Sequence, residues 1–188
     1  SYVGTALRAA TGEVLGIVNA IHDRPLDEVV RPEGVLQVFA ARAGAEVTGC
    51  DIATNWLDHA RNRADAEGLD IVFEEGDAEA LPYPNEQFDA VVSLIGAMFA
   101  PRPHRVAAEL SRVCKRGGVI AMANWTPDGF VGQMFRAISR YIAPNGMPAP
   151  ALWGDEATVR DRLSEGIADL NMERHNYRFH YPFAPEEV

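Results

Sequence analysis

Basic residues are scarce in this sequence, and this scarcity limits the partners that it can bind. Among the 188 residues, 17 are Lys or Arg and 27 are Asp or Glu, which gives a formal net charge of -10. Proteins bind nucleic acids and anionic membrane surfaces through clustered Lys and Arg. This balance therefore argues against both partners, and it favours a small cationic, neutral or apolar molecule.

Cysteines and long apolar runs are also few. Cys50 and Cys114 are isolated in apolar settings, so we expect free thiols and a reducing compartment. No apolar run reaches the length of a membrane span, and the first residues lack the basic-then-apolar pattern of a secretion signal. These features predict a cytoplasmic protein. No Cys/His spacing suggests a metal site, and no Ser/His/Asp set suggests hydrolysis.

From Glu46 onward, short apolar strands alternate with amphipathic helices. The strands are predicted at EVTGCDIA, IVFEE, FDAVVSLI and VIAMANW. FDAVVSLI is continuously apolar, as a strand buried on both faces should be. Helices are predicted after Thr54, with Gly68 as terminator, and after Pro103, ending at Gly117-Gly118. This order predicts a single α/β domain over residues 1–188, with a mostly parallel sheet and helices on both faces.

Acidic residues gather where the predicted strands end. Asp51 ends EVTGCDIA ahead of a helix, and Asp77 follows IVFEE in a Gly76-Asp77 bend. Open α/β sheets bind ligands at the carboxyl ends of their strands. The Asp51 carboxylate could accept hydrogen bonds from two ribose hydroxyls, or it could only begin a turn before the helix. Asp77 could recognise an exocyclic amine, or it could bond its own backbone in a turn.

The string GDAEALPYPNEQFD, from Gly76 to Asp89, resembles class I S-adenosylmethionine-dependent methyltransferases, in the branch of the ubiquinone and menaquinone biosynthesis enzymes. The resemblance covers residues 46–188. It implies a Rossmann-like fold, S-adenosylmethionine as cofactor, and methyl transfer to a small-molecule acceptor. It also implies that Asp51 holds the ribose and that Asp77 contacts adenine. The methyl group is already activated, so we nominate no catalytic side chain.

The resemblance extends to the residues around these two carboxylates. The candidate cofactor-binding residues are Asp51, Ile52, Gly76, Asp77, Ala78, Ser93 and Leu94. Family members place the methionine end of the cofactor and the methyl acceptor against the turn at Gly96. The candidate acceptor-binding residues are Met98, Phe99 and Trp125, although an apolar Met-Phe pair is more often part of a core.

The glycine-rich loop of this family is missing. Family members follow their first strand with GxGxG, where any Cβ would obstruct the approach of the cofactor. Without two or three backbone hydrogen bonds the cofactor would lose about 3–6 kcal/mol of binding free energy, or roughly a hundredfold or more in affinity. The alternative function is therefore a non-catalytic ligand-binding or interaction domain with the same fold. A nicotinamide-dependent dehydrogenase would need GxGxxG, which is equally absent.

Residues 1–46 differ from a methyltransferase start. They contain GTALRAATGEVLGIVNAIHDRPLD and VLQVFAARAGAE, which are similar to the closing hairpin, strand and helix of GAF-type sensor domains. A hairpin is predicted over residues 1–23, and a helix over Val35–Ala43. We expect the strand Val14–His22 to lie between EVTGCDI and FDAVVSLI, because the core backbone there needs a partner. Otherwise exchange between two chains, as a homodimer, would complete the sheet.

Residues 126–188 are less regular than the region before them. Helices are predicted after Asp128 and after Asp155, separated by the Pro/Gly-rich connector APNGMPAP. Since no strand-helix alternation continues here, we expect this region to form the acceptor-binding or cap part of the domain.

Overall fold

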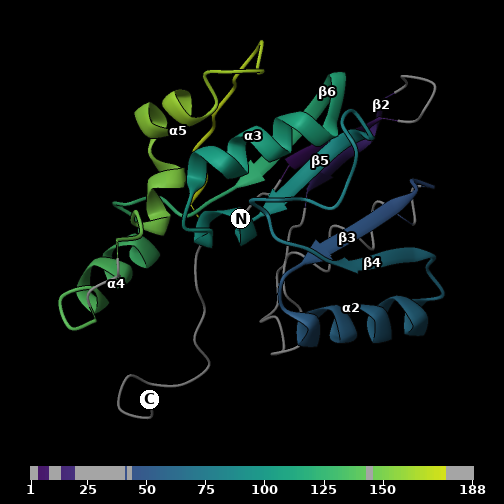
Figure 1. Cartoon of the computed structure of the whole chain (residues 1–188), viewed down its shortest axis with the longest axis horizontal. Coiled ribbons are helices and arrows are strands. Elements are labelled where there is room, and N and C mark those ends of the chain that lie inside the picture. Colours follow the sequence, from purple (N-terminus) through teal and green to yellow (C-terminus); the bar gives the residue numbers. More distant parts are fainter. Residues whose placement is uncertain (1–3, 9–13, 20–40, 42–43, 143–145, 177–188) are drawn as a thin grey trace.

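The computed structural model describes residues 4–8, 14–19, 41, 44–142 and 146–176 (Figure 1). Two β-α-β units form the body of the described structure, and a set of short helices follows them. Helix α3 lies above one pair of strands and helix α2 lies below the other pair (Figure 1). The predicted α/β class, with parallel strands and helices on both faces, is confirmed.

The first unit consists of β3 (Val47–Asp51), α2 (Thr54–Glu67) and β4 (Ile71–Glu75). The strands are parallel and in register from Val47 opposite Ile71 to Asp51 opposite Glu75. Helix α2 ends at Gly68, whose φ of 65° is the left-handed conformation that glycine adopts without a Cβ clash. The helix buries Leu57 and Ala64. The predicted strands, helix and terminator of this unit are confirmed.

The second unit consists of β5 (Phe88–Leu94), α3 (Pro103–Val113) and β6 (Cys114–Ala123). Helix α3 begins with Pro103, which fits the first turn because its missing N–H has no partner there. The predicted stripe of Val106, Leu110 and Val113 is buried. The predicted helix end at Gly117-Gly118 is wrong. The helix ends at Val113 and the chain passes directly into β6, which contains both glycines.

Strand β5 is less buried than its apolar sequence predicts. Val92 of β5 and Val119 of β6 are both exposed. Within the described residues, β5 pairs only with β6, and β3 pairs only with β4. The described sheet is therefore in two halves, and the expectation that β5 is buried on both faces is wrong.

Strands β1 (Gly4–Arg8) and β2 (Val14–Asn19) form the predicted antiparallel hairpin. Among the described strands, β2 pairs with β1 alone, so the central position predicted for Val14–His22 is wrong. Strand β1 is only a few residues away from β2 in the sequence, and closing so short a loop costs little entropy. Most of the predicted helix Val35–Ala43 lies outside the described residues.

The remaining helices pack against the second unit. They are η1 (Gly96–Phe99), α4 (Phe130–Ile138), η2 (Pro150–Gly154) and α5 (Glu156–Arg162). The helices predicted after Asp128 and Asp155 are thus confirmed. Asp155 caps α5, and the amide of Thr158 donates to its carboxylate at 3.0 Å. The main core is shared by η1, α3, η2 and α5 and contains Ala97, Met98, Val106, Ala107, Leu110, Trp153, Val159 and Leu163.

None of the helices in the described part of the chain combines the length and the apolar character needed to span a bilayer.

Candidate functional site

The carboxyl ends of β3 and β4 bring the two predicted carboxylates to one edge of the sheet. Asp51 is the last residue of β3 and lies opposite Glu75, the last residue of β4. The amide of Gly76 donates to the carbonyl oxygen of Asp51 at 3.1 Å, and Asp77 follows directly. Two residues that are 26 positions apart in the sequence are therefore neighbours, as predicted from the parallel strands.

Asp51 is exposed. It begins a turn before α2, which was the alternative to a role in ribose binding. The amide of Ala53 donates to Oδ1 of Asp51 at 2.8 Å. This bond orients the carboxylate and leaves it with further acceptor positions, since an ionised carboxylate has about four. Ile52, immediately after it, is 68% exposed. The end of β3 thus offers an oriented acceptor for hydroxyl groups beside an exposed apolar side chain.

Asp77 also sits in a turn with its own backbone. The amide of Glu79 donates to Oδ1 of Asp77 at 2.9 Å, and the amide of Ala80 donates to the Asp77 carbonyl at 2.9 Å. Ala78 is half-buried and packs against the main core. As at Asp51, the turn orients the carboxylate and uses only part of its acceptor capacity.

Gly76 is required by packing within the protein. A Cβ at this position would lie 2.6 Å from Sγ of Cys50 and 2.8 Å from Cδ of Pro82. Both distances are well inside van der Waals contact, so any other residue would push the loop away from β3. Gly76 therefore keeps Asp77 close to the strand end, whichever ligand binds there.

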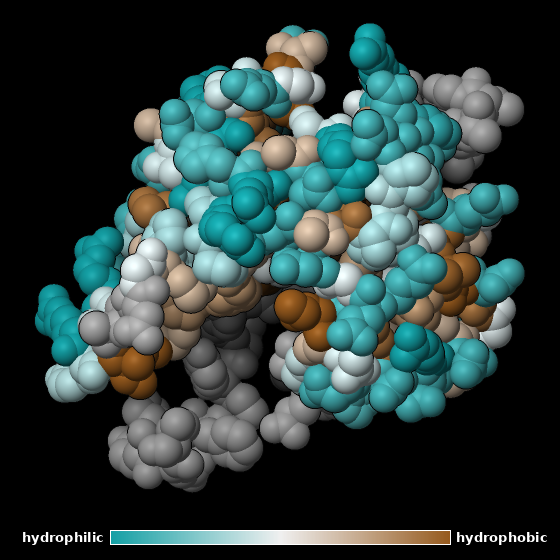
Figure 2. All heavy atoms as spheres, viewed as in Figure 1, coloured by the Kyte–Doolittle hydropathy of each residue, from teal (hydrophilic) through white to brown (hydrophobic). Residues whose placement is uncertain are grey.

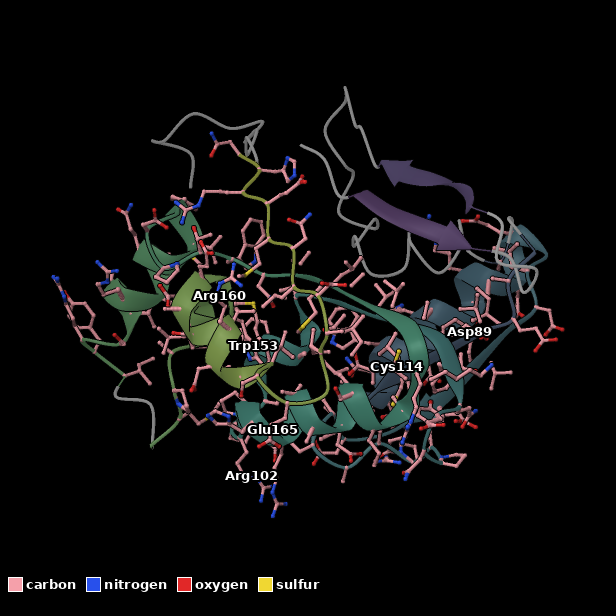
Figure 3. The ribbon with its side chains drawn as sticks, turned by 90° about the horizontal axis from the view of Figure 1, so that it is seen from above. Asp89, Arg102, Cys114, Trp153, Arg160 and Glu165 are labelled. Carbon is pink, nitrogen blue, oxygen red and sulfur yellow. The ribbon has the colours of Figure 1, made fainter. Side chains whose placement is uncertain are left out.

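An ion pair that the sequence did not reveal fastens this loop to the start of α3. Glu79 is buried, and the backbone amide of Arg102 donates to its Oε1 at 2.6 Å. The guanidinium Nε of Arg102 donates to the other carboxylate oxygen. Figure 3 shows Arg102 at the rim of the molecule, beside α3. Glu79 is the second acidic residue of GDAE, after Asp77, and its burial indicates a structural role.

The ion pair of Glu79 with Arg102 is one clamp on the loop after Asp77. A second clamp on the same loop comes from the far end of α3. The amide of Leu81 donates to Oε2 of Glu109 at 2.7 Å. Arg112 donates to Glu109, to the carbonyl oxygen of Tyr83 at 2.6 Å and to that of Leu81 at 3.0 Å. The bond from Arg112 holds the pKa of the Glu109 carboxyl below its usual range. The loop after Asp77 is thus held in place by α3 at both ends of the helix.

The Cys50 thiol of β3 and the Tyr83 hydroxyl of this loop are both neutral. Burial raises the pKa of the Cys50 thiol and, more strongly, that of the Tyr83 hydroxyl. A thiolate is the reactive form of cysteine, so Cys50 is poorly suited to act as a nucleophile. No group of three or more His, Cys, Asp and Glu in the described residues could hold a metal ion.

The carboxyl end of β5 forms the other side of the candidate site. The amide of Ala97 donates to Oγ of Ser93 at 3.1 Å, so the Ser93 side chain bonds to the backbone at the start of η1. Leu94 is buried, and the next residue, Ile95, has φ of 69°. A positive φ is unusual for a β-branched residue and marks a strained turn. Sequence patterns placed a turn here at Gly96, and nothing in them indicated that Ile95 carries the strain.

The three predicted acceptor-binding residues lie in different surroundings. Met98 is 2% exposed and belongs to the main core, which is the alternative left open for it. Phe99 is 47% exposed, and its ring contacts Phe135 of α4 edge to face, with centroids 6.0 Å apart. Trp125 is half-buried against the core. Of the three, Phe99 is the most accessible to an acceptor.

A family model described as "Methyltransferase domain" matches residues 29–122. The matched region is half of the chain and extends from before β3 into β6. The chain belongs to the methyltransferase domain family. The match begins earlier than residue 46, where the resemblance placed the start of the methyltransferase region.

Relatives of this methyltransferase domain extend the match along the chain. An uncharacterized protein of Mycobacterium tuberculosis is 42% identical over 176 residues, which cover 92% of this chain and 64% of that protein. The demethylmenaquinone methyltransferase of Deinococcus radiodurans is 38% identical over 101 residues, which cover 53% of this chain and 42% of that enzyme. This chain thus spans less than two thirds of the length of these relatives.

The methyltransferase domain also has solved structural neighbours. A putative sarcosine dimethylglycine methyltransferase from Galdieria sulphuraria superposes with a TM-score of 0.57 at 20% identity, over 71% of this chain and 49% of that one. The fold is the Rossmann-like fold of class I methyltransferases. Residues 1–46 are about a quarter of the chain, so the 92% match to the mycobacterial relative includes much of them. Their resemblance to a sensor domain stays a prediction.

Proposed function

We propose that this domain binds S-adenosylmethionine and transfers its methyl group to a small-molecule acceptor. The observation that carries the proposal is the meeting of Asp51 and Asp77 at the carboxyl edge of β3 and β4. Each carboxylate is oriented by one backbone amide. This arrangement suits the adenosyl half of the cofactor, which presents two ribose hydroxyls and an exocyclic amine as donors.

In this proposal the adenosyl half is bound by Asp51, Ile52, Gly76, Asp77 and Ala78. Ser93 and Leu94 lie toward the methionine half, at the end of β5. The cofactor supplies an already activated methyl group when bound, so the protein chiefly holds the two reactants in line. The strained turn at Ile95 positions η1, and with it Phe99, at the edge where the acceptor would lie.

The acceptor that we propose is a small neutral or apolar molecule. Phe99 and Trp125 supply apolar surface beside η1, and residues 126–188 would form the rest of the acceptor or cap region. The name of the D. radiodurans relative, a demethylmenaquinone methyltransferase, supports a place in the ubiquinone and menaquinone branch. The acidic balance of the chain supports a partner other than nucleic acid, and we propose a cytoplasmic location.

Calorimetric titration with S-adenosylmethionine and S-adenosylhomocysteine tests the cofactor site. Asp51→Ala and Asp77→Ala should each weaken binding by about tenfold to a hundredfold, because each removes charged hydrogen bonds to the ligand. The matched control is Asp70→Ala, an exposed carboxylate at the opposite end of β4. Equal affinities of the wild type and Asp77→Ala would show that the site is assigned wrongly.

A non-catalytic ligand-binding or interaction domain is the second candidate. It is favoured by the sequence, which has no GxGxG loop to hold the methionine half of the cofactor. If neither cofactor form binds the wild type at millimolar concentration while the protein unfolds cooperatively, this candidate replaces the first.

A further inference from the structure

The region around α4 has a local charge opposite to that of the whole chain. Residues 129–154 contain no Asp or Glu, and their only charged residues are Arg136 and Arg140. Elsewhere acidic residues are dense, since 27 of the 188 residues are Asp or Glu. The net charge of -10, from which we expected no membrane partner, therefore does not describe this surface.

Helix α4 and the turn after it carry a stripe of exposed apolar side chains. The stripe consists of Phe130, Met134, Ile138, Tyr141 and Ile142, whose exposed fractions run from 39% to 89%. The first three are spaced by four residues and so lie on one face of the helix. Val131 and Phe135 lie on the other side of the helix, where Val131 is buried and Phe135 packs against the core.

Helix α4 lies at the end of the described structure farthest from α2 (Figure 1). In Figure 2 the same lower-left end shows brown and tan atoms next to teal ones. Arg136 of α4 and Arg140 of the turn after it are both exposed, and Nη2 of Arg136 donates to the carbonyl oxygen of Pro127 at 3.2 Å. Helix α4 and the turn after it thus combine an apolar stripe with two cations.

The acidic residue next to this surface is already neutralised. Asp128 precedes α4, and Nη1 of Arg174 donates to its Oδ2 at 2.6 Å. The same bond lowers the pKa of the Asp128 carboxyl, so it remains ionised and paired. The surface around α4 is therefore positive as well as apolar.

We propose that α4 and the turn after it dock onto the surface of a lipid bilayer that contains anionic headgroups. A helix with exposed aromatic and aliphatic residues on one face and arginines beside them lies in the membrane interface, with the apolar face among the acyl chains. Each arginine adds attraction to the anionic headgroups. A second copy of the chain fits less well, because a symmetric contact through α4 would place the arginines of both copies together.

This docking would bring the acceptor side of the domain to the lipid. The edge-to-face contact of Phe135 with Phe99 joins α4 to η1, at the carboxyl end of β5. An apolar molecule that leaves the bilayer beside α4 would reach Phe99 first. The proposal rests on the surface of α4, and it does not require that the domain be an active methyltransferase.

Vesicle co-sedimentation of the whole chain tests the proposal. The probes are vesicles of phosphatidylcholine alone and vesicles of phosphatidylcholine mixed with phosphatidylglycerol. The wild type should bind the mixed vesicles more tightly. The double variant Ile138→Ser/Tyr141→Ser should weaken that binding by about tenfold or more. Arg136→Gln/Arg140→Gln should weaken it by about thirtyfold and remove the preference for the mixed vesicles.

Matched controls separate this surface from exposed residues in general. Val72→Ser/Val119→Ser removes two exposed apolar side chains on strands, and Arg105→Gln/Arg116→Gln removes two exposed cations. Both controls should bind as the wild type does, and circular dichroism should show all variants folded. The proposal is overturned if the wild type binds neither kind of vesicle, or if the controls weaken binding as much as the α4 variants. It is equally overturned if the α4 variants change only the oligomeric state measured by light scattering, since a second copy would then cover the stripe.

Discussion

The two β-α-β units have the same order of elements and differ in how much they bury. Helix α3 places Val106 and Leu110 in a core shared with η1, η2 and α5, and it also buries Val113. Helix α2 buries only Leu57 and Ala64. The difference originates in the sequence, because TNWLDHARNRADAE offers mainly polar and small side chains whereas PHRVAAELSRV offers a stripe of large aliphatic ones.

This difference separates the two halves of the candidate site. Asp51 ends a strand of the thinly packed unit, whereas Phe99 and η1 rest on the densely packed one. The loop that begins at Asp77 connects them, since it leaves β4 and is clamped to α3. The adenosyl side is therefore expected to depend on that clamp for its position, and the acceptor side on the main core.

A pair of leucine truncations tests the difference in packing and should give the largest effect. Leu57 and Leu110 are almost equally buried, at 4% and 5% exposed. Leu110→Ala should lower the free energy of unfolding by about 3–5 kcal/mol, because it opens a cavity inside the main core. Leu57→Ala should cost about 2–3 kcal/mol, since α2 can settle onto its strands. Urea denaturation followed by circular dichroism measures both, and equal losses would show that the two units are equally well packed.

The clamp at Glu79 should have a smaller effect on stability. Glu79→Ala removes a buried acceptor from the Arg102 amide and guanidinium, and we expect a loss of about 2 kcal/mol in the free energy of unfolding. The matched control is Glu86→Ala, which breaks the exposed pair with Arg116. That change should cost less than about 1 kcal/mol. If Glu79→Ala were no more destabilising than its control, the loop would not depend on this ion pair.

Sequence patterns predicted the features that depend on neighbours in the chain. The start of α3 at Pro103 and the end of α2 at Gly68 are set by the backbone needs of single residues. The burial of Met98 and the exposure of Phe99 were not predictable in the same way. They are adjacent in sequence, yet one is in the core and the other is exposed, because η1 follows the strained turn at Ile95.

Features that join distant residues were the harder part to predict. The pairing of β2 depends on which strand comes to lie beside it, and an apolar strand suits a hairpin and a sheet interior equally. The bond from Arg102 to Glu79 spans 23 positions, and no local pattern in the sequence indicated it. In the structure, Glu79 of that string supports the loop, whereas Asp77 remains available to a ligand.

The clamp between Glu109 and Arg112 should give the smallest effect, and it depends on pH. The pKa of Glu109 is lowered in the folded state, so its stabilising contribution is fully present above the pKa of the unfolded chain. The contribution is lost as the pH falls through the lowered folded-state value. At neutral pH, Glu109→Gln should cost about 1–2 kcal/mol in the free energy of unfolding, and the difference from the wild type should shrink toward zero in acid.

The corresponding pair on the other unit supplies the control for this prediction. Arg63 and Glu67 lie four residues apart on α2 and are joined at 3.0 Å. This pair lies within one helix, so Glu67→Gln should cost about 0.5 kcal/mol or less. Chemical denaturation at a series of pH values compares the two variants. A Glu109→Gln loss that stays constant with pH would mean that the glutamine disturbs packing, and that the charge on Glu109 does not hold the loop to α3.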